Sequence, residues 1–204
     1  MSRSGRSFPR TTNPQVATAL RRVHSLPPPD DVALPVLDPF VGLRERLNAA
    51  VTLEESERSW LIHQLATARE SYDQVKGSRE RARVLHGDAH GGNIVATTDG
   101  EVVLLDFERV AIGPPEWDLV SIAVENDSVT LCTDADYAEL VDEYGEDVKN
   151  WPHYEMFRSI RELRMTCYIA ELANDHPAAR DEARFRVECL RGEHGERPWP
   201  WTPM

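Results

Sequence analysis

Apolar residues recur every three to four positions over most of this chain, which is the spacing of helices with one buried face. Stretches with this spacing, bounded by capping residues, glycines or prolines, cover residues 13–26, 39–51, 52–75, 116–124, 133–144, 153–173 and 177–190. The stretch 153–173 carries apolar residues on two sides, with Cys167 on one and Tyr168 on the other, so we expect it to lie buried between neighbours. The pattern predicts an α+β fold that is mostly helical.

Three of the predicted helices begin with recognisable capping residues. Asn13 stands before Pro14, so we expect Asn13 to cap the first helix. Thr52 stands three residues before Glu55, the spacing of a capping box. Thr133 precedes an aspartate at the same spacing. These residues fix where three helices are expected to start.

The two ends of the chain differ in character. Residues 1–12 hold three arginines among serines and a glycine with no acidic residue, which predicts a flexible tail before one folded domain over residues 13–204. At the other end, Trp199 and Trp201 stand two residues apart. Indole rings bury much apolar surface, so we expect this end to dock on the fold.

A different pattern occupies the middle of the chain. Residues 84–85 are apolar, residues 86–93 contain three glycines, and residues 94–95 are apolar again. A turn signal at residues 99–100 then leads into a second apolar run at residues 102–107. We expect short strands here, with a hairpin that brings their ends together.

Three polar side chains mark the ends of these strands, namely Asp88, Asn93 and Asp106. The first two fit H-x-D-x-x-x-x-N, the arrangement of a kinase catalytic loop, and a D-F-x tripeptide follows on the next hairpin. The chain resembles the kinase-like phosphotransferases that include aminoglycoside phosphotransferases and choline kinases. The matching positions are His86, Gly87, Asp88, Asn93, Asp106, Gly113, Asp118 and Leu119.

This resemblance implies a fold and a set of roles. The fold is a protein-kinase-like C-terminal lobe whose short β-hairpins carry the catalytic loop. Asp88 would be catalytic and orient the attacking hydroxyl, while Asn93 and Asp106 would hold the Mg²⁺ of bound ATP or GTP. Mg²⁺ prefers oxygen ligands and takes only one or two from protein, which suits one amide and one carboxylate. His86 and Asp118 would support the loop, His86 by packing and Asp118 by accepting hydrogen bonds from backbone amides.

The resemblance covers only the C-terminal lobe, so we expect the N-terminal lobe to be absent. Upstream glycines are too far apart for a G-x-G-x-x-G loop, and neither Lys76 nor Lys149 has the strand context of the phosphate-binding lysine. We therefore expect an ATP- and Mg²⁺-dependent small-molecule phosphotransferase that is weak or inactive alone. A second copy of the chain, as a homodimer, or a separately encoded lobe would complete the cleft.

Two other functions stay open at this point. The first is a non-catalytic remnant or binding module with the same fold. The second is a metallophosphoesterase, because residues 88–91 also spell the D-x-H-G of many two-metal sites. The remaining histidines stand alone in the sequence, which disfavours this reading.

The composition of the chain limits which binding partners and which cellular compartment we expect. The formal net charge is -12, with 35 acidic against 23 basic residues, which disfavours nucleic acid and suits a cationic small substrate. No apolar run is long enough to span a membrane, and none resembles a secretory signal. Three widely spaced cysteines favour reduced thiols and a cytoplasmic protein.

Acids after the second motif are substrate-binding candidates by location only: Glu125, Asp127, Asp134 and Asp136.

Overall fold

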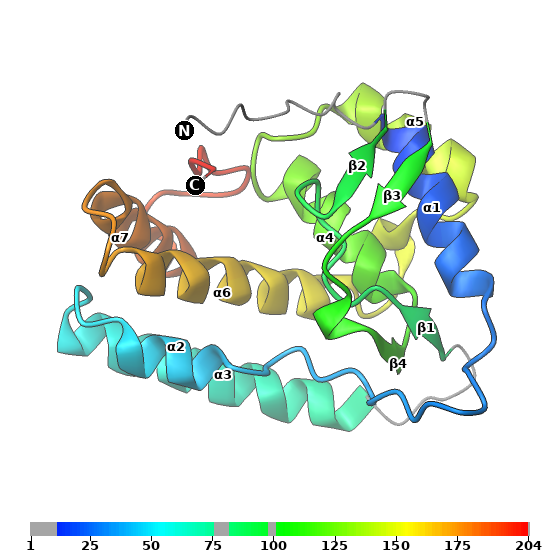
Figure 1. Ribbon diagram of the computed structural model, residues 1–204. Helices are drawn as coiled ribbons and strands as arrows, with labels where there is room; N and C mark the ends of the chain where they lie inside the picture. The colour runs from blue at the N-terminus through cyan, green and yellow to red at the C-terminus, as the bar shows by residue number, and fades with distance from the viewer. Residues whose placement is uncertain (1–11, 76–81, 98–100, 204) are drawn as a thin grey trace, which may run out of the picture.

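The computed structural model describes residues 12–75, 82–97 and 101–203 (Figure 1). The turn signal at residues 99–100 lies outside these ranges. The expected tail, residues 1–12, also lies outside them except for Thr12. The helices are α1 (Asn13–Ser25), α2 (Leu43–Ala49), α3 (Glu55–Val75), α4 (Glu116–Asp127), α5 (Asp134–Tyr144), α6 (Tyr154–Leu172) and α7 (Ala178–Leu190). The strands are β1 (Arg83–Leu85), β2 (Ile94–Ala96), β3 (Val102–Leu104) and β4 (Ala111–Gly113), and two 3₁₀ turns are η1 (Phe107–Arg109) and η2 (Val148–Asn150). The predicted α+β, mostly helical fold is confirmed.

The four strands form two small antiparallel sheets. β2 pairs with β3, so the expected hairpin is present, with Val95 opposite Val103. β1 pairs with β4 and not with β2, although β1 and β2 flank the same loop. The loop 86–93 therefore passes from one sheet to the other. Its two ends are held by different partners.

Two of the three expected helix caps are wrong. Thr12, not Asn13, is the N-cap of α1, and the Oε1 atom of Gln15 accepts a hydrogen bond from the Thr12 amide at 3.0 Å. α3 begins later than expected, and the Oε2 atom of Glu57 accepts from the Glu54 amide at 2.8 Å. The Thr52 hydroxyl is buried without a hydrogen-bond partner among the described residues. The third cap is confirmed, since the Thr133 side chain accepts from the Asp136 amide.

α6 is the centre of the helical core. It packs against α2 and α3 on one side and against α4 and α7 on others, as Figure 1 shows for the helices around it. Ile160, Cys167 and Ile169 are buried, which confirms that this helix lies between neighbours. Tyr168 is 47% exposed, so the second apolar side is less buried than expected. Three polar side chains are buried on this helix instead: Arg161, Glu162 and Thr166.

The C-terminal segment docks on the fold, as expected. Trp199 and Trp201 are buried and stacked, with ring centroids 5.3 Å apart, against Val129 and Cys189. The Trp199 amide donates to the Ser128 carbonyl at 2.8 Å, which ties the segment to the end of α4. Among the described residues, none of the helices has the length and apolar character needed to cross a membrane.

Candidate active site

The loop between β1 and β2 is anchored by one buried carboxylate. Asp118, on α4, is fully buried, and its two oxygens accept hydrogen bonds from the amides of His86 at 2.8 Å and Gly87 at 2.9 Å. The Nε2 atom of His24, on α1, donates to the same carboxylate at 3.0 Å. Because three donors satisfy this buried charge, it can fix the loop without a large desolvation penalty.

Gly87 is required by the geometry of this anchor. Its φ is +84°, in the left-handed region that glycine adopts freely. A Cβ atom at this position would lie 2.0 Å from the carbonyl oxygen of Arg109. The Gly87 carbonyl also accepts from the indole N–H of Trp117 at 2.9 Å. The loop backbone is therefore packed from both sides at this residue.

His86 links the loop to the second hairpin. Its ring is buried, and Nε2 donates to the carbonyl of Leu105 at 2.8 Å, just beyond the end of β3. Phe107 packs on the same ring, with centroids 5.3 Å apart. Through this ring the residues after β3 are held against the loop that carries Asp88.

Asn93 and Asp106 lie at this junction. The Nδ2 atom of Asn93 donates to the backbone carbonyl of Asp88 at 3.0 Å, and the Asn93 carbonyl accepts from the Leu105 amide at 2.8 Å. Asp106 follows Leu105 directly, with an exposed side chain and a φ of +60°. The structure thus brings the loop carrying Asp88 and Asn93 and the strand end carrying Asp106 to one place.

Asp88 is held by a basic side chain from a distant helix. The Nη1 atom of Arg161, on α6, lies 2.8 Å from Asp88 Oδ1, while the Nε2 atom of His90 lies 4.0 Å from Oδ2. Burial raises the pKa of Asp88, but the charge and hydrogen bond of Arg161, helped by His90 and Arg164, outweigh it. The pKa of Asp88 is therefore lowered, and the side chain is a carboxylate at neutral pH.

His90 and Glu125 border Asp88. Burial lowers the pKa of His90, with Arg161 acting in the same direction while Asp88 and Asp106 oppose it. The His90 ring therefore lies within electrostatic reach of both predicted site carboxylates. Burial raises the pKa of Glu125, on α4, against the opposing charge of Arg161 and a hydrogen bond from the Gly91 backbone.

The sequence model of the phosphotransferase enzyme family matches residues 12–162, most of the chain. The chain belongs to this phosphotransferase family. The matched range contains the whole loop, its anchor on α4 and the arginine on α6. No curated protein matches the chain in sequence.

Solved structures support the fold of this phosphotransferase-family chain. A choline/ethanolamine kinase family protein from Mesorhizobium loti is 18% identical, with a TM-score of 0.60 over 88% of this chain and 61% of that one. Spectinomycin phosphotransferase in complex with ADP and spectinomycin is 15% identical, with a TM-score of 0.59 over 95% of this chain and 64% of that one. Choline kinase from Streptococcus pneumoniae is 12% identical, with a TM-score of 0.58 over 88% and 64%. The chain thus spans less than two thirds of the length of these structures.

Sequence reasoning missed two residues that contact the predicted site residues Asp88 and Asp118. Arg161 is separated from Asp88 by 73 positions, and His24 from Asp118 by 94. The only available signal for Arg161 was a charged residue between apolar positions of a helix predicted to be buried. His24 lies on the apolar stripe of α1, where its ring was not distinguished from a packing residue.

The other acids proposed by location have structural partners. Asp127 accepts from the hydroxyl of Tyr154 at 2.6 Å and pairs with Arg158 at 3.1 Å. Asp134 accepts from the amide group of Asn126, and Asp136 belongs to the cap of α5. Glu125 accepts a hydrogen bond from the Gly91 backbone and so lies beside the loop that carries Asp88.

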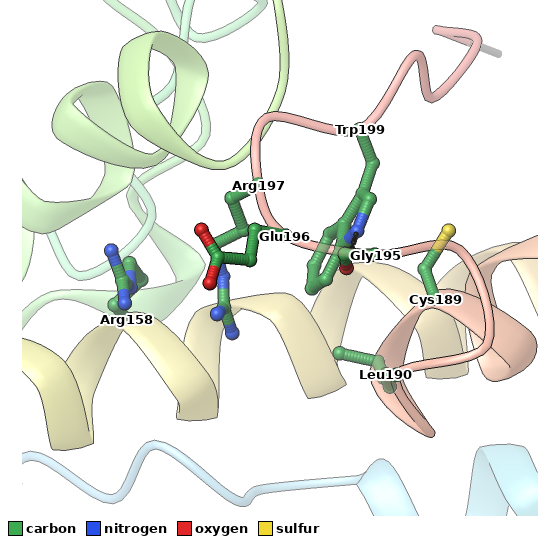
Figure 2. Close-up of a pocket in the computed structure, with 8 residues that line it drawn as sticks. Arg158, Cys189, Leu190, Gly195, Glu196, Arg197 and Trp199 are labelled. Carbon is green, nitrogen blue, oxygen red and sulfur yellow. Dashed lines mark hydrogen bonds between the residues drawn. The ribbon is translucent and has the colours of Figure 1, made fainter.

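A pocket near the C-terminal segment lies apart from this loop. Figure 2 shows Glu196, Arg197 and Trp199 on that segment and Arg158 across the pocket, on α6. Arg197 is already bound to both oxygens of the buried Glu162, at 2.6 Å each, and Arg158 is paired with Asp127 and Glu155. These arginines are engaged with the protein's own carboxylates.

The described residues give no support to the metallophosphoesterase alternative. Within residues 12–75, 82–97 and 101–203, no three His, Cys, Asp or Glu side chains are grouped to hold a metal ion. A two-metal site requires several such ligands.

Proposed function

We propose that this chain carries the catalytic loop of an enzyme that transfers the γ-phosphoryl group of ATP or GTP to the hydroxyl of a small molecule. The observation that supports the proposal most strongly is the convergence of Asp88, Asn93 and Asp106, fixed from behind by Asp118. Phosphoryl transfer depends mainly on positioning and charge stabilisation, so a rigid constellation of this kind is what the reaction needs.

Asn93 and Asp106 fit a magnesium ion. The hydrogen bond from Asn93 Nδ2 to Asp88 turns the other end of the amide, Oδ1, away from that contact, and no donor to Oδ1 is recorded among the described residues. Asp106 is exposed, and the described part of the chain gives its carboxylate no hydrogen bond or ion pair. Two such oxygens suit Mg²⁺, which would neutralise charge on the phosphates.

Asp88 would receive the proton of the attacking hydroxyl. Its lowered pKa keeps it ionised, so it accepts a hydrogen bond from the acceptor and orients the oxygen toward phosphorus. A bond forms between that oxygen and the γ-phosphorus, the bond to the bridging oxygen breaks, and the proton moves to Asp88. The nucleoside diphosphate leaves.

The described residues supply little for the outer phosphates of a nucleotide. Lys149, on η2, is bound to Asn126 and lies over the ring of Tyr137. Apolar side chains are exposed around the predicted metal ligand, with Val103 40%, Leu105 41% and Phe107 55% exposed. We propose that this side is covered by a second copy of the chain or by a lobe outside these 204 residues, and that these residues alone bind nucleotide weakly.

Thermal unfolding with and without Mg²⁺ and ATP tests the metal and nucleotide site. We expect millimolar Mg²⁺ and ATP to raise the melting temperature, and Asp106→Ala to abolish the shift. Asp88→Asn should keep the shift, because Asp88 contacts the acceptor. Asp142→Ala, an exposed position on α5, is the control.

A transfer assay tests the chemistry. Small alcohols such as choline and spectinomycin are offered with radiolabelled ATP, and Asp88→Asn should lower transfer by roughly 100-fold or more. A non-catalytic binding module would show the nucleotide-dependent melting shift without transfer to any acceptor. No shift at millimolar nucleotide, together with no transfer, would reject the proposed function for this chain.

A further inference from the structure

Arg161 is an unusual residue for the centre of a helical core. It is 7% exposed, on the helix that packs against α4, and its Nη1 atom makes a 2.8 Å bond to Asp88 Oδ1. Its Nε atom is buried with no hydrogen-bond partner in the described part of the chain. A buried cation with incomplete hydrogen bonding costs folding energy, so a stabilising role alone explains it poorly.

Arg197 and Arg186 are bound more completely than Arg161, whereas Arg158 and Arg164 also have a buried Nε atom without a partner in the described part of the chain. Arg197 grips both oxygens of Glu162, and the Nε atom of Arg186 binds Glu182 at 2.6 Å while its Nη2 atom binds the Thr202 carbonyl at 2.8 Å. These contacts satisfy several donors each, as expected for structural pairs. Within the described residues, Arg161 makes one hydrogen bond, and it goes to the carboxylate of Asp88 on the loop.

The contact with Arg161 gives the two carboxylate oxygens of Asp88 different surroundings. Oδ1 is bound by Arg161, whereas the recorded group nearest to Oδ2 is the His90 ring at 4.0 Å. The Asp88 backbone is fixed independently by the side chain of Asn93. With the backbone held and one oxygen bound, rotation about the side-chain bonds is restricted, and Oδ2 is the oxygen left for a substrate.

The partners of the neighbouring charged residues indicate that Arg161 is the residue that orients Asp88. Arg164, also on α6, donates to the carbonyl of Pro39 at 2.6 Å and lies over the Trp117 ring. Glu125, on α4, is close enough to Arg161 for their charges to interact. Arg161 therefore interacts with two carboxylates, and its hydrogen bond among the described residues goes to Asp88.

We propose that Arg161 is a positioning residue that holds Asp88 by Oδ1 and turns Oδ2 toward the acceptor hydroxyl. The inference rests on the proposed function. It predicts that loss of the guanidinium lowers the rate of transfer with little effect on nucleotide binding, because the nucleotide's metal is held by other residues.

Variants on one helix separate positioning from stability. Arg161→Gln and Arg158→Gln each break an arginine–aspartate pair on α6, three residues apart, but only the first contacts the catalytic loop. We expect Arg161→Gln to lower kcat by roughly 10- to 100-fold, with the nucleotide KM changed by less than about twofold. Arg161→Lys should retain more activity than Arg161→Gln. Arg158→Gln should lower the melting temperature while kcat stays within about twofold.

Chemical rescue and crystal structures complete the test. Guanidinium ion at non-denaturing concentration should raise kcat of Arg161→Ala by at least about fivefold and leave Arg158→Ala unchanged. In crystals of Arg161→Gln the Asp88 side chain should leave its original orientation, whereas it should keep that orientation in Arg158→Gln.

Two outcomes overturn the proposal. One is an equal loss of kcat in Arg161→Gln and Arg158→Gln without rescue by guanidinium. The other is an unchanged Asp88 side chain in Arg161→Gln. If the original chain transfers no phosphoryl group to any acceptor, the proposed function fails, and the crystal structures still decide whether Arg161 positions Asp88.

Discussion

At the scale of residues, the site depends on a few side chains that each make several contacts. Asp118 receives donors from α1 and from two successive loop amides, and His86 joins that loop to the end of β3. Such fully satisfied buried groups allow a loop to be rigid, although its residues form no regular structure. Changes at these points should therefore affect stability as well as chemistry.

Gly87 provides the clearest test at this scale. Alanine there would place Cβ against the Arg109 carbonyl in a backbone conformation that alanine disfavours. We expect Gly87→Ala to lower the free energy of unfolding by about 2 kcal/mol or more. Gly91→Ala, where an added Cβ meets nothing within 4 Å, should stay within about 0.5 kcal/mol. Urea unfolding of both variants measures the difference, and equal losses would contradict the packing argument.

The ion pair of Asp88 and Arg161 predicts a pH dependence. Because the folded-state pKa of Asp88 lies below its ordinary value of 3.8, the pair stabilises the fold above that value. The stabilisation is lost as pH falls through the folded-state pKa. We therefore expect Asp88→Asn to be less stable than the original chain at pH 7, and the gap to narrow as the medium is acidified below pH 4. A gap independent of pH between 7 and 3 would contradict this assignment.

At the scale of elements, the spacing of capping residues in the sequence does not by itself determine where a helix begins. The packing of the folded chain also decides it. Thr52 and Glu55 have the spacing of a capping box, yet α3 begins at Glu55 and Glu57 is the residue that reaches back to the Glu54 amide. The buried Thr52 hydroxyl has no hydrogen-bond partner in the part of the chain that the structure describes. Tertiary packing of this segment overrides the local signal.

The start of α3 can be tested with two substitutions. Glu57→Ala should lower the free energy of unfolding by about 1 kcal/mol, because a cap interaction is lost. Thr52→Val should be neutral or stabilising, because it replaces an unsatisfied buried hydroxyl with a methyl group. Thermal unfolding compares the two. A larger loss in Thr52→Val would restore Thr52 as the cap.

The sequence predicted long elements well and pairings less well. The periodicity of residues 153–173 was sufficient to place α6 in the core, and tandem tryptophans were sufficient to dock the C-terminal segment. It could not show that β1 pairs with β4, because both are three residues long and 25 residues of the sequence lie between them. The contact of Arg161 with Asp88 could not be predicted from the sequence either, because it depends on how α6 crosses the loop.

At the scale of the whole molecule, the net charge of the chain acts at long range, whereas the charged residues of the site act at short range. The chain carries a formal net charge of -12, which attracts cations from solution. The site itself places Arg161, with Arg164 beside it, next to Asp88. At physiological ionic strength the Debye length is about 8 Å, so exposed acids far from the site contribute little to a bound acceptor. Charges within the site are screened less.

Choline and its uncharged isostere 3,3-dimethyl-1-butanol separate these two effects, because they share one shape and differ in charge. With Arg161 beside Asp88, we expect the neutral alcohol to have a KM equal to or below that of choline at 0.15 M salt. Lowering the salt should reduce the KM of choline alone, because the long-range attraction is then less screened. Phosphoryl transfer to both alcohols at two ionic strengths measures this. A lower KM for choline at both salts would mean that acidic groups of the acceptor site outweigh Arg161, and Glu125→Gln would then identify whether the carboxylate on α4 is the one responsible.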